Sequence, residues 1–122
     1  MSLGGDNISD SSRPALRSVV AGAVLGLLVE LPAVLAAIIS SGAGHGDYFA
    51  ARALFPLPML LTLVEGSIGV LSITLILLQF PIYGVLLGWA RVRNAGLPVL
   101  VVALLHLGAT IACFTGMLPN FS

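Results

Sequence analysis

The sequence predicts an all-α membrane protein with three transmembrane helices plus a short re-entrant or fourth spanning helix. Of its 122 residues, 58% are hydrophobic and only 8% are charged, whereas a soluble domain has roughly 25% charged residues. The mean hydropathy is +1.11. A chain of this size cannot bury so much apolar surface in a water-soluble core. The lipid bilayer is therefore its expected solvent and its first partner.

The first span is expected from Val19 to Ile39. As an α-helix this run measures about 31 Å, which matches the hydrocarbon thickness of a bilayer. The preceding residues 1–12 are mostly Gly, Ser, Asp and Asn, so we expect a disordered polar tail that ends at Ser12. Residues 13–122 are expected to form a single transmembrane helical bundle.

The stretch from Tyr48 to Ala90 is too long for one straight span and must fold back. The expected break is the sequence EGSIG at 65–69, which divides the stretch into helices of roughly 50–64 and 70–92. The first of these helices is short and contains two prolines. It either crosses the bilayer with local thinning or tilt, or enters and leaves it on one side.

The last span is expected from Leu97 to Leu118, after an Asn-Ala-Gly turn. Two arginine pairs flank these segments: Arg13 with Arg17, and Arg91 with Arg93. Positive charge favours the cytoplasmic side of a membrane. Three full spans plus a re-entrant segment put both pairs on that side, with the N-terminus inside and the C-terminus outside. Four full spans would put one pair outside, so we favour three.

Glu30 lies at the centre of the first span, where an ionised carboxylate costs at least a few kcal/mol. Helical spacing puts it on one face with Gly22 and Gly26, a small-residue surface that lets another helix approach closely. It is either a hydrogen-bonded link between two helices or a proton or cation site. His106 lies at similar depth in the last span, so it either pairs with Glu30 or binds a backbone carbonyl.

Polar residues also occur at the expected break and in the helix that follows it. Glu65 is a candidate cap for the free N–H groups of that helix, and otherwise a candidate proton or ligand site. Gln79, Pro81 and Tyr83 surround an expected proline kink. This cluster serves either interhelical hydrogen bonding or a pocket for a lipid, a quinone or a pigment.

Small residues predict further surfaces for close helix packing. They are Gly84 and Gly88 in the third quarter of the chain, and Gly108 and Gly116 in the last span. These surfaces indicate a compact bundle, a homo-oligomer or a partner membrane protein. The single cysteine, Cys113, excludes a disulfide within the chain and is expected to pack as a small apolar residue.

Motifs typical of enzymes are missing from the sequence, which contains no G-x-S-x-G, H-E-x-x-H, C-x-x-C or phosphate loop. We therefore expect no catalytic activity. His45 and Asp47 beside a glycine turn are typical of a solvated loop, so no metal site and no cofactor are expected. The formal net charge is zero, which leaves no basic face for nucleic acid.

The runs GHGDYFAARALFPLPMLL and QFPIYGVLLG, followed by a late histidine, resemble a group of small uncharacterised bacterial integral membrane proteins. The shared elements are GHG-x-Y, LFP and QFP-x-YG, and they cover roughly residues 44–110. The resemblance implies a multi-pass protein of the bacterial inner membrane. The resemblance implies no particular activity, but it marks these residues as motif positions: His45, Tyr48, Gln79, Pro81 and Tyr83.

The chain is also similar in length to the small multidrug resistance exporters, which have four helices and a membrane-embedded Glu that exchanges protons for cationic drugs. Glu30 would be that residue, but Pro32 and the GHG loop depart from the pattern. Three hypotheses follow. The leading one is a non-catalytic accessory subunit of a membrane complex, or a small homo-oligomer. The alternatives are a proton-coupled carrier of small solutes or cations that uses Glu30, and a protein that binds a lipid, quinone or pigment.

Overall fold

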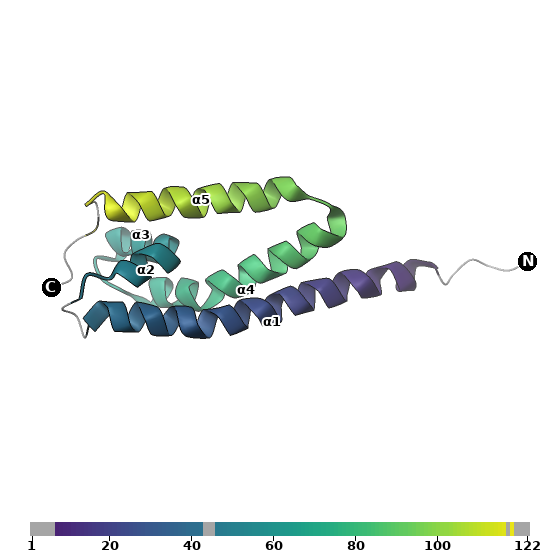
Figure 1. The fold of residues 1–122 in the computed structure, drawn as a ribbon, viewed down its shortest axis with the longest axis horizontal. Helices are drawn as coiled ribbons and strands as arrows, with labels where there is room; N and C mark the ends of the chain where they lie inside the picture. The colour runs from purple at the N-terminus through teal and green to yellow at the C-terminus, as the bar shows by residue number, and fades with distance from the viewer. Residues whose placement is uncertain (1–6, 43–45, 117, 119–122) are drawn as a thin grey trace, which may run out of the picture.

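The structure is a computed structural model, and it describes residues 7–42, 46–116 and 118. This part of the chain contains five helices (Figure 1): α1 (Asn7–Ser41), α2 (Phe49–Leu54), α3 (Pro56–Glu65), α4 (Val70–Arg93) and α5 (Gly96–Phe114). Three of them, α1, α4 and α5, are long and apolar enough to cross a bilayer, whereas α3 is shorter. The predicted fold class is therefore confirmed.

The helices are arranged around α4 (Figure 1). α1 and α5 lie on opposite sides of the bundle, with α4 and the α2–α3 pair between them. Within the described residues α1 packs along α4 and against α2, and it does not touch α5. The short helices lie at the end where α1 and α5 finish, so the α2–α3 pair starts and ends on one side. This is the arrangement of a re-entrant segment between the first and second spans.

Both arginine pairs lie at the opposite end of the bundle. The hydroxyl of Ser18 donates a hydrogen bond to the carbonyl of Gly88, with an oxygen–oxygen distance of 3.0 Å. This contact puts the part of α1 next to Arg17 level with the last turns of α4, next to Arg91. Three spans and the α2–α3 pair thus bring both arginine pairs to one end of the bundle, as the sequence predicted. Its assignment to the cytoplasm is a prediction from charge.

The sequence prediction for the start of α1 needs correction. α1 begins at Asn7 instead of near Ser12, and residues 1–6 lie outside the described part. Asp and Ser are tolerated in a first turn because they bind free N–H groups and suit the positive end of the helix dipole, so a polar composition does not exclude helix there. Tyr48, one of the positions marked by the family resemblance, is buried, with 8% of its surface exposed.

The segment predicted as one helix before the EGSIG break is two helices, separated at Phe55 (φ −125°, ψ 52°). Pro56 and Pro58 cause the break. Neither has a backbone N–H, so the carbonyls of Arg52 and Leu54 lose the donors that a continuous helix would supply. A residue before proline also avoids the helical region of backbone conformation. The chain therefore turns at Phe55 and reverses its course within the bundle.

The contact between α1 and α4 is built on glycine. A Cβ atom added to Gly22 would overlap the carbonyl oxygen of Gly84 and lie 2.8 Å from its carbonyl carbon. A Cβ on Gly84 would in turn lie 2.7 Å from the carbonyl carbon of Gly22. Gly26 meets the backbone of Phe80 in the same way, and Gly88 meets that of Ser18. The two backbones touch, so four of the six predicted packing glycines form one interface.

The other two predicted packing glycines have no such role within this chain. A Cβ atom on Gly108 or on Gly116 would meet no heavy atom within 4 Å among the described residues. Both lie on exposed surface of the last span or just after it. Their use in packing against a second chain stays a prediction.

A small core closes the end of the bundle that holds α2 and α3. Tyr48, Met59, Cys113 and Leu118 are buried together there. The thiol of Cys113 lies 3.4 Å from the carbonyl oxygen of Pro56, at hydrogen-bond distance for sulfur. The segment around α2 and α3 and the end of the last span, which are far apart in sequence, thus share one core.

Glu65 caps the start of α4 across the glycine break. Its Oε1 accepts the N–H of Leu71 at 3.1 Å, and its Oε2 accepts the N–H of Ser72 at 3.1 Å and the Ser72 hydroxyl. The hydrogen bond from the Ser72 hydroxyl is the main cause that lowers the pKa of Glu65 below its ordinary 4.5. This is the capping geometry that the sequence favoured at this position.

The lowered pKa of Glu65 predicts a pH-dependent stability. Above pH 4.5 the ionised cap contributes fully, and this contribution is lost as the pH falls through the lowered pKa of the folded state. We expect Glu65→Gln to lower the unfolding temperature at pH 7, and the difference from wild type to shrink in acid. Thermal unfolding in detergent from pH 7 to about pH 3 measures it. Ser67→Ala, an exposed change in the same turn, is the control, and a pH-independent gap for Glu65→Gln would contradict the capping role.

Candidate functional site

The break between α2 and α3 is held by side chains from the two later spans. Gln79 Nε2 of α4 donates to the Leu54 carbonyl at 2.8 Å. In a continuous helix that carbonyl would accept the N–H of residue 58, which is a proline. Gln79 is buried, and its Oε1 has no hydrogen-bond partner among the described residues. A membrane-buried carbonyl freed by proline is thus satisfied by a side chain of a neighbouring helix.

His106 of α5 binds the same break. Its Nε2 lies 3.3 Å from the Ala53 carbonyl oxygen, and its Nδ1 lies 3.1 Å from the Tyr83 hydroxyl. A carbonyl only accepts, so Nε2 carries a proton and donates to Ala53. In the tautomer that has its one proton on Nε2, Nδ1 is an acceptor and the Tyr83 hydroxyl donates to it. Both donors of the pair are used, and only the lone pairs of the Tyr83 oxygen stay free.

The His106–Tyr83 pair lines a cavity of about 370 Å³ between α4 and α5. The eight lining residues are Phe80, Tyr83, Leu86, Leu87, Val99, Val102, Ala103 and His106. Apart from the polar pair, all are apolar. The volume lies within the usual range for small-molecule sites, and the mixture of apolar walls with one polar feature is typical of them. We call this cavity the α4–α5 cleft.

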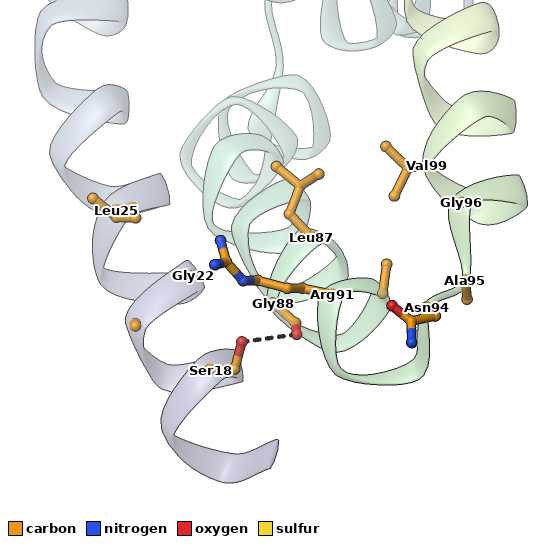
Figure 2. Close-up of a pocket in the computed structure, with 12 residues that line it drawn as sticks. Ser18, Gly22, Leu25, Leu87, Gly88, Arg91, Asn94, Ala95, Gly96 and Val99 are labelled. Atoms are coloured by element: carbon orange, nitrogen blue, oxygen red, sulfur yellow. Dashed lines mark hydrogen bonds between the residues drawn. The ribbon is translucent and has the colours of Figure 1, made fainter. Parts of the chain in front are cut away.

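A larger cavity of about 760 Å³ lies at the arginine end of the bundle (Figure 2). α1, α4 and the start of α5 form its walls. The side chain of Arg91 extends from α4 across it towards α1, and Asn94 lies at its edge. Leu87 and Val99 line this cavity and the α4–α5 cleft alike. We call it the interfacial cavity.

Glu30 links α1 to α4 and lines neither cavity. It is buried, with 4% of its surface exposed, and its Oε2 accepts the N–H of Phe80 at 3.3 Å. Phe80 precedes Pro81, which lies inside α4 and interrupts its hydrogen-bond ladder. Oε1 of Glu30 is buried without a hydrogen-bond partner among the described residues. The contact is the helix-linking arrangement that was one of the two interpretations of this residue.

The structure does not bring Glu30 and His106 together. The hydrogen-bond partner of Glu30 is the backbone of α4, and those of His106 are Tyr83 and Ala53. The helices that carry the two residues do not touch within the described chain. Equal depth in the bilayer therefore did not place them on facing surfaces.

The remaining predicted positions separate into distinct regions. Gln79 and Tyr83 face the α2–α3 break and the cleft, whereas Tyr48 belongs to the core at the end of the bundle. His45 lies outside the described residues. Among the described residues, no group of three or more His, Cys, Asp or Glu side chains could hold a metal ion.

Sequence reasoning missed most of the cleft and the role of Arg91 in the interfacial cavity. Val99, Val102 and Ala103 are apolar residues in an apolar helix, and such residues carry no pattern that separates a cavity wall from a lipid-facing surface. Arg91 was informative only about topology. Tyr83 and His106 were the signals for the cleft, because a phenol or an imidazole within a span needs a hydrogen-bond partner nearby.

Comparison with known proteins adds no further assignment to these sites. No family model matches the chain, and no curated protein or solved structure is significantly similar to it, so its function has to be inferred from geometry and chemistry.

Proposed function

We propose that this small polytopic membrane protein is a non-catalytic lipid-binding protein that holds an alkyl chain in the α4–α5 cleft. The observation that supports this proposal most is the hydrogen bonding of Tyr83 and His106, the polar pair in the cleft. The donors of Tyr83 and His106 are both used within the protein. An alkyl chain beside them therefore leaves no donor unsatisfied, and the apolar walls suit it.

The same hydrogen bonds argue against a quinone or a pigment held by its carbonyl groups. Such a ligand needs a donor, but in the tautomer with the proton on Nε2 the Tyr83 hydroxyl donates to His106 and Nε2 donates to Ala53. Binding a carbonyl would strip one of these acceptors of its partner, at a cost of about 1–3 kcal/mol. An alkyl chain carries no such cost.

The other two hypotheses receive less support. A carrier that uses Glu30 needs a solute path beside it, but Glu30 lines neither cavity and binds the backbone of α4. An accessory subunit or homo-oligomer would pack a second helix on the exposed surface at Gly108 and Gly116. That role is compatible with lipid binding and stays a prediction.

Filling the cleft tests the proposal. Ala103 lines the cleft from α5, so Ala103→Phe places an aromatic ring in the space for the chain. Wild type is purified in a mild detergent, washed extensively, and extracted with organic solvent for lipid analysis. We expect wild type to retain lipid in stoichiometric amounts and Ala103→Phe to lose most of it.

Leu104→Phe is the matched control, because Leu104 is exposed on the same helix and lies outside the cleft. It should retain lipid as wild type does. Equal lipid content in wild type and Ala103→Phe would overturn the proposal, since the retained lipid would then be bound elsewhere. Recovery of a stoichiometric quinone or pigment would overturn it as well.

A further inference from the structure

The two cavities adjoin each other along α4, and we call the two together the groove. Leu87 and Val99 line both, one from α4 and the other from α5. In Figure 2 the two side chains lie between the facing helices, above the turn that joins them. The two cavities therefore meet at this pair of apolar side chains.

The groove is polar at one end and apolar at the other. Arg91 and Asn94 lie at the bundle end, with the Arg91 guanidinium reaching across the cavity (Figure 2). No acidic side chain that the structure describes pairs with Arg91. The carboxylates of Glu30, Asp47 and Glu65 bind other groups, and none of the three lines this cavity. Among the described side chains, Arg91 thus presents to the interfacial cavity a positive charge without an acidic partner, above an apolar groove.

The length of the groove fits one lipid chain. Tyr83, at the deep end, lies eight residues before Arg91 in α4. Eight residues of α-helix span about 12 Å. An acyl chain of one leaflet reaches to the middle of a hydrocarbon core of about 30 Å, or about 15 Å. A headgroup at Arg91 would therefore place its chain beside the His106–Tyr83 pair.

From these observations we infer that the bound lipid is an anionic phospholipid, with its phosphate at Arg91 and one acyl chain in the α4–α5 cleft. The inference rests on the proposed function and adds the headgroup class. A guanidinium binds phosphate through two parallel charge-assisted hydrogen bonds, and the Asn94 amide is a further donor. The arginine end is also the end expected in the cytoplasm, where leaflets carry anionic lipid.

The test compares headgroups on the same chains. Delipidated protein is titrated with dioleoyl phosphatidic acid and with dioleoyl phosphatidylcholine, and binding is followed by native mass spectrometry. We expect the anionic lipid to bind wild type about tenfold more tightly, which corresponds to about 1.4 kcal/mol. Arg91→Gln should remove this preference. Arg93→Gln, which changes a neighbouring arginine outside the cavity, should keep it.

The outcomes separate the inference from the proposed function. Equal binding of the two lipids by wild type, with loss of both in Ala103→Phe, would overturn the anionic headgroup and leave the chain site intact. Binding of neither lipid in the cleft, with no effect of Ala103→Phe, would overturn both. Glycerol 3-phosphate, which has the phosphate but no chain, should not compete at similar concentrations. Competition by it would show a site for a free anion and overturn the lipid assignment.

Discussion

Gly84→Ala is expected to destabilise the bundle by about 3 kcal/mol, at the upper end of the cost of adding a methyl group to a packed interior. The added Cβ would lie on the backbone carbonyl of Gly22. A backbone group cannot rotate away as a side chain can, so α1 and α4 must move apart. That movement also weakens the neighbouring contacts at Gly26 and Gly88, which depend on the same helix distance.

Gly108→Ala is the matched control for this substitution. Gly108 lies within α5, and no heavy atom of the described residues would meet its new Cβ within 4 Å. Alanine favours helix over glycine by about 0.5–1 kcal/mol, so this variant should be as stable as wild type or more stable. Unfolding in dodecyl sulfate, followed by circular dichroism and Trp89 fluorescence, measures both. Equal stability of the Gly84→Ala variant and wild type would contradict the close approach of the two helices.

Phe55→Ala is expected to have the other large effect, a loss of about 3–5 kcal/mol. The Phe55 side chain is 0% exposed, and its ring meets the Phe80 ring edge to face with the centroids 5.5 Å apart. In a bilayer the loss comes from packing, because lipid is as apolar as the protein interior and transfer contributes little. The truncation leaves a cavity at the point where the backbone turns between α2 and α3.

Phe49→Ala removes an equally large ring from the same segment and serves as the comparison. Phe49 is 60% exposed and contacts Phe114 at a centroid distance of 5.4 Å. Its truncation should cost less than about 1.5 kcal/mol, the range for one aromatic pair. Hydrogen exchange of the amides in α2 and α3 is the local readout. It should accelerate strongly in Phe55→Ala and little in Phe49→Ala, and similar rates in the two variants would contradict a central role for Phe55.

The sequence predicted the spans and their order well because length and apolar content determine what crosses a bilayer. The break before Val70 and the glycines at positions 22, 26, 84 and 88 were also identified, because glycine and helical spacing act locally. The arginine pairs predicted the arrangement of the ends. Each of these inferences depends on a short stretch of chain or on the membrane itself.

Positions that depend on which helices face each other were not predictable. The spans are apolar on all sides, and a lipid-facing residue and a buried one have the same composition. The sequence therefore could not show that α1 and α5 lie apart, or that Glu30 and His106 bind different partners. The burial of Tyr48 and the position of Val99 in the walls of the two cavities likewise depend on tertiary contacts.

The link between Glu30 and Phe80 also constrains how the protein is made. The two residues are fifty positions apart in the chain. At about 5–20 residues per second, a ribosome needs roughly 2.5–10 s to add that length. During this interval the carboxyl group of the first span has no α4 to bind. In the bilayer core an ionised carboxylate without a partner costs at least a few kcal/mol, so until α4 arrives the Glu30 carboxyl group has to be protonated or hydrated.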